Sequence, residues 1–103
     1  MRITVNERTE AVVMKLEGSA SGPGLKEFEK TWLSLVPLLD SRKLVLDLRG
    51  VTFIAPEAMN TLSEIYDQAQ PEFQTSTLVA KHIVEAIIHD YNQKRAQKAA
   101  RKG

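Results

Sequence analysis

Hydrophobic and polar residues alternate with the two-residue period of a β-strand in two segments, residues 11–17 and residues 43–48. One set of alternate positions is apolar throughout: Val12, Met14, Leu16, Leu44, Leu46 and Leu48. The other set mixes apolar and charged side chains, among them Val13, Lys15, Val45 and Asp47. A shorter strand is predicted at residues 3–6. Because only one set is fully apolar, the pattern predicts a sheet that is well covered on one face.

Apolar residues at helical spacing follow a run of small residues at positions 18–24. In this run Ser21 or Gly22 is the predicted N-cap, and Pro23 takes the first helical position. The apolar stripe consists of Leu25, Phe28, Trp32, Leu35 and Leu39. We interpret Trp32 as a core anchor, and we expect Pro37 to end or kink this helix in its last turn.

Two more helices are predicted in the second half of the chain. The first opens at Pro56 and stops at Pro71, and its apolar side consists of Ala58, Met59, Leu62, Ile65, Tyr66 and Ala69. A fourth strand is predicted near residues 76–80. The last helix follows it, with a stripe of Ile83, Val84, Ile87, Ile88 and Tyr91. Right-handed crossovers in this order predict a two-layer α/β fold, a mixed sheet of about four strands with the helices mainly on one face.

Length and composition fit one globular domain. The chain has 103 residues, of which 43% are hydrophobic and 26% are charged, enough for a single core. It has no cysteine, which excludes disulfides and cysteine-ligated zinc. Residues 1–10 lack the apolar core of a signal peptide, and no segment is long enough to span a membrane, so a cytoplasmic location is expected.

The net charge of +1 is unevenly distributed along the chain. The ionisable side chains after Asn92 are all basic: Lys94, Arg95, Lys98, Arg101 and Lys102. Removing these five charges leaves the preceding residues at −4. We therefore divide the chain into a domain at residues 1–91 and a basic tail at residues 92–103, which is either a frayed helical extension or disordered. The basic tail either balances the negative end of the helix dipole or contacts acidic lipid headgroups. Binding of nucleic acid is not expected, because no aromatic residue lies among these basic residues to stack on a base.

Residues 44–59, LVLDLRGVTFIAPEAM, form the most distinctive motif. The motif predicts a buried strand ending at Leu48, a tight turn at Arg49-Gly50, a short apolar run at residues 51–54 and a helix starting at Pro56. This layout resembles the STAS family, which includes anti-sigma-factor antagonists and the tails of sulfate transporters. Asp47 fits the family's strand aspartate, and Gly18 ends the second strand much as a family glycine does.

The resemblance also shows what this chain lacks. After the apolar run, family members carry an aspartate, two small hydroxyl residues and a glycine, and the second hydroxyl is phosphorylated by a partner kinase. Here the four positions are Ala55, Pro56, Glu57 and Ala58. The usual glycine before the fourth strand is also missing from residues 71–73. Thr52, Thr61 and Ser63 do not occupy the start of the helix, so we interpret them as structural hydroxyls and expect no phosphorylation at the usual site.

Glu57 places a permanent negative charge where the family carries its phosphate. One hypothesis is that Glu57 mimics the phosphorylated state and holds the protein in one signalling form. The other is that an acidic residue simply stabilises the first turn of a helix, by about 0.3–1 kcal/mol.

Catalytic and metal-binding patterns are not found in the sequence. His82 and His89 are seven residues apart, which is too far for a one-turn metal pair on a helix. The glycines at positions 18–24 do not follow a phosphate-loop spacing. We therefore predict that the protein is not an enzyme and needs no cofactor or metal.

The resemblance implies a bacterial, non-catalytic regulator of the STAS type that acts in signal transduction and transcription regulation. It implies that the protein works by protein–protein docking and that its partner is an anti-sigma factor or a serine kinase. The predicted partner-binding residues are Ala55, Pro56, Glu57, Ala58, Asn60 and Thr61. The alternative is an accessory STAS subunit that docks on the cytoplasmic ATPase of a membrane lipid transporter, and nucleotide binding is the weakest possibility. If the helices leave one sheet face open, Val13 and Val45 beside Lys15 and Asp47 form a dimer or partner surface.

Overall fold

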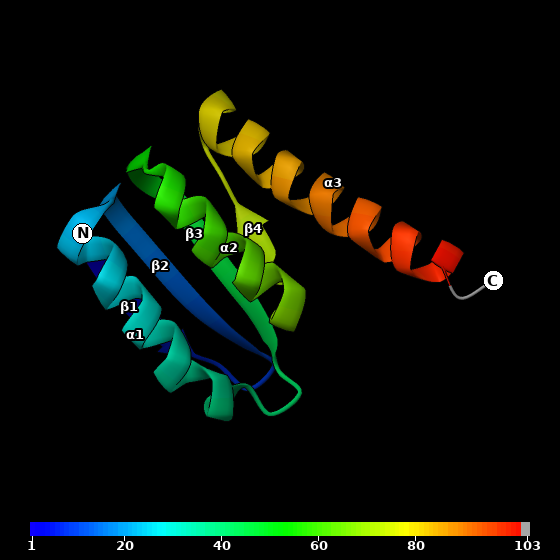
Figure 1. The fold of residues 1–103 in the computed structure, drawn as a ribbon. Helices are drawn as coiled ribbons and strands as arrows, with labels where there is room; N and C mark the ends of the chain where they lie inside the picture. Colours follow the sequence, from blue (N-terminus) through cyan, green and yellow to red (C-terminus); the bar gives the residue numbers. More distant parts are fainter. Residues whose placement is uncertain (102–103) are drawn as a thin grey trace.

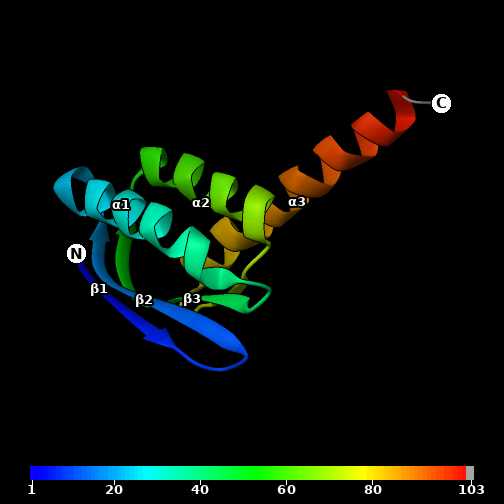
Figure 2. The same ribbon diagram turned by 90° about the horizontal axis from the view of Figure 1, so that it is seen from below.

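The computed structural model describes the backbone of residues 1–101 and the side chains of residues 1–97. Its elements, in chain order, are β1 (Arg2–Glu7), β2 (Ala11–Ala20), α1 (Gly22–Leu39), β3 (Lys43–Ile54), α2 (Pro56–Ala69), β4 (Glu72–Gln74) and α3 (Leu78–Arg101). The strands form one sheet in the order β1-β2-β3-β4, with β1 antiparallel to β2 and the other pairs parallel. The helices cover one face of this sheet, as Figures 1 and 2 show. The predicted two-layer α/β fold is therefore confirmed.

The hydrophobic core lies between the sheet and the helices. All six residues of the apolar alternating set are at most 2% exposed, so the predicted covered face is confirmed. Helix α1 contributes Phe28 and Trp32 to this core, and Trp32 is the anchor that its stripe predicted. The other main contributions are Leu62 and Ile65 of α2, and Val84 and Ile87 of α3.

Strand β3 is one long strand, and the predicted turn at Arg49-Gly50 is wrong. Lys15 pairs with Asp47 while Glu17 pairs with Gly50, so β3 contains one extra residue between these pairs. A second extra residue lies between the pairs Gly18–Val51 and Ser19–Phe53. An Arg-Gly pair resembles a turn in sequence, but here the glycine permits close approach of two strands at a bulge. A Cβ atom on Gly50 would lie 2.8 Å from the Cγ atom of Glu17.

Strand β2 also runs further than predicted, because Gly18 does not end it. Gly18 has a φ of 95° and lies beside the second register shift, inside a strand that continues to Ala20. Glycine adopts this φ readily and other residues do not. The positive φ thus lets the strand bend at the bulge without ending.

Replacing Gly18 with alanine is expected to lower the free energy of unfolding by about 1–2 kcal/mol, because an L side chain is strained at this φ. Urea denaturation measures the loss. The matched control is Gly18→Asn, which should lose less because asparagine tolerates positive φ better. Equal losses in the two variants, or none in either, would contradict a conformational role for Gly18.

The fourth strand lies earlier in the chain than predicted. It is the three-residue strand β4, which pairs with Val45, Leu46 and Asp47 of β3. Residues 76–80, the predicted strand, instead lead into α3. Thr77 caps this helix, since its Oγ1 accepts a hydrogen bond from the backbone N–H of Ala80 at 3.1 Å. The threonine and the apolar pair Leu78-Val79 are typical of a strand, but the capping hydrogen bond stabilises the start of a helix here.

Helix α1 has Ser21, one of the two predicted residues, at its N-cap. It begins at Gly22, so Pro23 takes the second helical position and not the predicted first. It ends two residues after Pro37, where Asp40 adopts a left-handed conformation. Pro37 therefore lies in the last turn of the helix, where it was predicted to end or kink α1.

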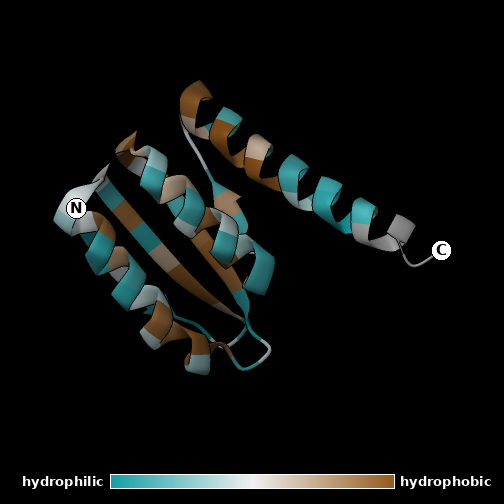
Figure 3. Cartoon of the chain, viewed as in Figure 1, coloured by the Kyte–Doolittle hydropathy of each residue, from teal (hydrophilic) through white to brown (hydrophobic). Residues whose placement is uncertain are grey.

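The first half of α3 packs on the domain, and its second half projects away from it (Figures 1 and 2). Tyr91 lies at the end of the packed part. Its ring contacts that of Tyr66 edge-to-face, with 5.1 Å between the two ring centroids. The packed half carries the hydrophobic residues, and the projecting half is hydrophilic (Figure 3). Residues 92–101 continue the helix, while residues 102–103 and the side chains of Lys98, Arg101 and Lys102 lie outside the description. The division at residue 91 stays a prediction.

Candidate functional site

The predicted docking segment begins at the edge of the sheet where three helices start. Strands β2, β3 and β4 are parallel, so their carboxyl ends lie at the same edge, and α1, α2 and α3 begin there. Figure 1 shows the starts of all three helices along this edge. The segment at residues 55–61 is the N-cap and the first turns of α2.

The backbone holds this segment in a defined place. The N–H of Ala55 donates to the carbonyl oxygen of Ala20 at 3.1 Å, which ties the entry of α2 to the end of β2. Ala55 is the N-cap, and Pro56 opens the helix without a side-chain cap. Proline suits this position because its φ is already helical and its missing N–H would have no partner there. The sequence therefore fixes the direction of α2 through the backbone.

The six predicted docking residues divide into two groups. Pro56, Glu57 and Asn60 are exposed, so a partner can reach them. Ala55, Ala58 and Thr61 are buried, with exposed fractions of 4%, 0% and 6%. The structure therefore places three of the residues on the surface, and the other three support the segment from below.

Ala58 supports the segment from inside the core. Its methyl group is fully buried, at the position where the resemblance seen in the sequence implies a glycine. The first turn of α2 has room for this Cβ atom, so the helix start keeps its geometry without the glycine.

Thr61 joins α2 to α1. Its hydroxyl donates a hydrogen bond to Oε1 of Glu29 at 3.0 Å. This contact supports the structural interpretation of Thr61, because the hydroxyl is engaged and its residue is buried.

Replacing Thr61 with valine is expected to lower the free energy of unfolding by about 1 kcal/mol, the usual contribution of one intramolecular hydrogen bond. Thermal or urea denaturation measures the change. The control is Thr31→Val on α1, where an exposed hydroxyl bonds only the carbonyl oxygen of Glu27 in its own helix. A loss no larger than that of the control would mean that the Thr61–Glu29 contact does not stabilise the fold.

Three exposed apolar side chains at the same edge were missed from the sequence. Phe53, near the end of β3, is 56% exposed, and Leu78 and Val79, in the first turn of α3, are 75% and 71% exposed. The alternation pattern counts such residues as buried strand positions. Their exposure depends on the bulges of β3 and on the true start of α3, which a single sequence does not reveal.

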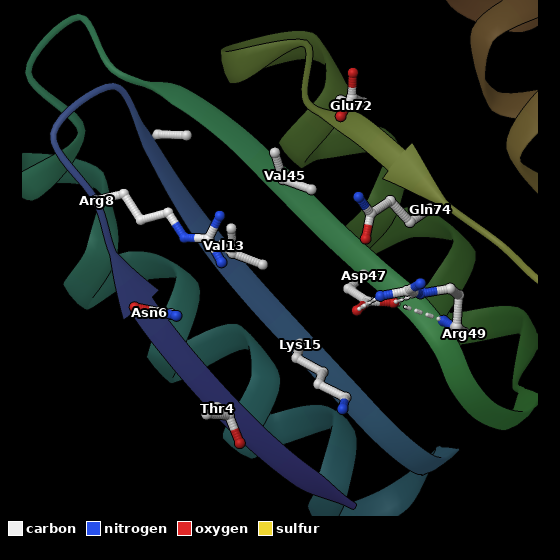
Figure 4. A pocket seen from close by; sticks show the side chains of 11 residues that line it. Thr4, Asn6, Arg8, Val13, Lys15, Val45, Asp47, Arg49, Glu72 and Gln74 are labelled. Atoms are coloured by element: carbon white, nitrogen blue, oxygen red, sulfur yellow. Dashed lines mark hydrogen bonds and ion pairs between the residues drawn. The ribbon is translucent and has the colours of Figure 1, made fainter.

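The second notable surface is the face of the sheet opposite the helices. The helices leave this face open (Figure 2), which is the condition under which Val13 and Val45 were expected to form a dimer or partner surface. The face contains a hollow of about 500 Å³ with Val13, Lys15, Val45 and Asp47 in its lining. Figure 4 shows these side chains on the open side of the strands. We call this feature the open-face hollow.

Asp47, the residue at the position of the family aspartate, lies in the open-face hollow and is held by Arg49. The Nε and Nη2 atoms of Arg49 lie 3.0 Å and 2.9 Å from the two carboxylate oxygens, and the Arg49 backbone N–H donates to Oδ1 at 3.1 Å. The Asp47 side chain is only 5% exposed. These hydrogen bonds hold the pKa of the Asp47 carboxyl below its ordinary value. Asp47 therefore has a structural role in the sheet.

Among residues 1–97, no cluster of three acidic or histidine side chains is arranged to hold a metal ion. His82 and His89 are both exposed on α3. None of the helices within the described part of the chain is long and apolar enough to cross a membrane.

Comparison with known proteins gives matches in structure alone. No family model matches this sequence, and no curated protein matches it either. Among solved structures, the chain is similar to the crystal structure of Mglu, with a TM-score of 0.58 and 18% identity over 72% of this chain. The match spans 19% of that chain, about a fifth of its length.

A second similar structure is the anti-sigma factor antagonist SpoIIAA in its unphosphorylated form. The similarity has a TM-score of 0.49 and 9% identity, and it covers 84% of this chain and 97% of that one. The match to the first of these structures shows a shared fold alone, since the identity is 18%. The strand order and the helices of this chain themselves form the two-layer α/β architecture that the sequence predicted.

Proposed function

We propose that this protein is a non-catalytic, STAS-type regulator that docks on another protein through the start of α2. The observation that carries the proposal is the exposure of Pro56, Glu57 and Asn60 at the start of α2, where Ala55, Ala58 and Thr61 are buried. A surface held in this way loses little conformational freedom on binding, which favours recognition of a partner.

The proposed mode of action needs no phosphate at the usual position. None of residues 55–58 has a hydroxyl group, so a kinase has no acceptor there. Glu57 is exposed in the first turn, where the helix N-terminus favours a negative charge. Docking is then controlled by partner concentration and by a fixed charge, without a phosphorylation cycle.

The proposed partner is an anti-sigma factor or a serine kinase, and we place the encounter in the cytoplasm. The alternative partner is the ATPase subunit of a transporter. Affinity purification from the native host with mass spectrometry distinguishes them. Recovery of a kinase-like ATPase supports the regulator, while recovery of transporter subunits replaces it with the accessory role.

The docking surface is tested with a matched pair of substitutions on α2. Asn60 and Gln68 are both exposed amides on this helix, and only Asn60 lies near its start. Asn60→Lys is expected to weaken binding of the recovered partner by about tenfold, while Gln68→Lys leaves it unchanged. Calorimetric titration measures both. Equal affinities for the two variants would show that the partner docks elsewhere.

The role of Glu57 is tested by replacing it with serine and with alanine. If Glu57 mimics a phosphate that opposes docking, both variants bind the partner more tightly than the parent does. If it only stabilises the first turn of α2, both bind as the parent does, and the mimic hypothesis is contradicted. A loss of affinity in both variants would instead make Glu57 a direct contact.

A further inference from the structure

The open-face hollow has an apolar floor. Strand pairing puts Asn6, Val13, Val45 and Glu72 in one row across the sheet. The two valines are therefore neighbours on adjacent strands, separated by the usual strand spacing of about 4.8 Å. Val45 is 7% exposed and Val13 is half-buried, although no helix covers this face. The volume of about 500 Å³ lies within the range of small-molecule sites.

Cations surround this floor. Arg8, Lys15 and Arg49 all line the hollow, and in Figure 4 the guanidinium group of Arg8 reaches over the sheet toward Val13. The backbone of Arg8 is fixed at the β1–β2 turn, where its N–H donates to the carbonyl oxygen of Ala11 at 2.8 Å. Its own carbonyl oxygen accepts a hydrogen bond from Nη1 of Arg42 at 3.2 Å. The turn thus holds Arg8 at the rim of the hollow.

The two carboxylates of the lining are already paired. Asp47 is bound by Arg49, and Glu72 is 3.1 Å from Nζ of Lys43. Within the described residues, neither Arg8 nor Lys15 has an acidic partner within 4.0 Å. The hollow therefore has uncommitted positive charge, although residues 1–93 as a whole carry a charge of −4. This local surplus is complementary to an anion.

We propose that the open-face hollow binds a small aromatic carboxylate. Its ring lies flat on Val13 and Val45, where two adjacent strands offer a level apolar surface. Its carboxylate lies between Arg8 and Lys15, on the side away from Glu72, which would repel it. The Arg49 guanidinium is fixed by its two bonds to Asp47 and adds positive charge to the lining of the hollow. This site is separate from the proposed docking surface, which lies at the start of α2.

The test is titration of the full chain with naphthoate, followed by calorimetry and by the amide chemical shifts of the protein. Naphthamide, the neutral analogue of the same shape, is the matched ligand. We expect naphthoate to shift the amides around Val13 and Val45, and naphthamide to bind about tenfold more weakly, since a charge-assisted contact is lost. Arg8→Gln and Lys15→Gln should each weaken naphthoate binding by about the same factor.

The control variant is Lys26→Gln, which removes an exposed cation from α1 on the other side of the sheet. It should leave naphthoate binding unchanged, as should Asn60→Lys, which tests the docking surface separately. The proposal is overturned if naphthamide binds as well as naphthoate, if millimolar naphthoate shifts no amide of the open face, or if Arg8→Gln and Lys15→Gln bind like the parent. It is also overturned if the chain is a dimer that Val13→Glu converts to a folded monomer, because a second copy then covers this face.

Discussion

Replacing Phe28 with alanine is expected to lower the free energy of unfolding by about 3–5 kcal/mol, the usual cost of removing a buried aromatic ring. Phe28 is 1% exposed and belongs to the core between α1 and the sheet. The cost combines the lost burial of the ring with the cavity that it leaves. Because small domains are only marginally stable, this loss is a large fraction of the total.

Urea denaturation of the parent and the variant measures this loss. The control is Leu33→Ala on the same helix, where the side chain is 69% exposed and the change should stay within about 0.5 kcal/mol. If Phe28→Ala cost no more than Leu33→Ala, α1 would not be anchored to the sheet by its buried stripe.

The sequence determines the buried face of this fold more clearly than it determines the ends of the strands. Alternation and helical stripes depend on which side chains leave water, so they identified the covered face, Trp32 and the one-sided helices. Strand ends depend on backbone geometry that several residue types share. Gly18 and Gly50 both resemble strand terminators in sequence, yet each lies inside a strand that bends at a bulge.

The fourth strand was predicted too late in the chain for a related reason. A threonine followed by leucine and valine has high strand propensity, but one hydrogen bond from Ala80 to Thr77 makes this stretch the start of α3. Strand β4 has only three residues, too few for an alternating pattern. Its position is set by pairing with β3, which is a tertiary contact and leaves no local signal.

The candidate docking residues could be located from the sequence but not sorted by exposure. The motif placed all six at the start of α2, where the structure has them. It did not indicate that Thr61 turns inward to bond Glu29, or that Phe53 is exposed at the same edge. The sequence indicated Val13 and Val45 as a surface only on the condition that the face is open, and it did not indicate a hollow there. The contribution of Arg8 depends on the geometry of the β1–β2 turn.

Replacing Arg49 with methionine is expected to lower the free energy of unfolding at neutral pH, because it leaves the Asp47 carboxylate, whose side chain is only 5% exposed, without its cation. The Arg49 side chain is 59% exposed, so little packing is lost with it. Asp47 would keep one hydrogen bond, from the backbone N–H of residue 49. The control is Lys43→Met, which breaks the exposed pair with Glu72 and should change stability by at most about 1 kcal/mol.

The same substitution should change the dependence of stability on pH. In the parent, the pKa of Asp47 in the folded state lies below its ordinary value of 3.8, because Arg49 donates hydrogen bonds to the carboxylate. The stability that this pair contributes is therefore present above pH 3.8 and is lost as the pH falls through the lowered pKa. Without the Arg49 side chain, the largest cause of the lowered pKa of Asp47 is lost, so less of the stability of the folded state depends on the charged form of this carboxyl. The free energy of unfolding that Arg49→Met loses relative to the parent should thus be largest at neutral pH and should shrink below pH 3.8. Urea denaturation of both proteins above and below that pH measures this difference. A deficit that is the same at both pH values would mean that Arg49 stabilises the sheet by its packing and not by its charge on Asp47.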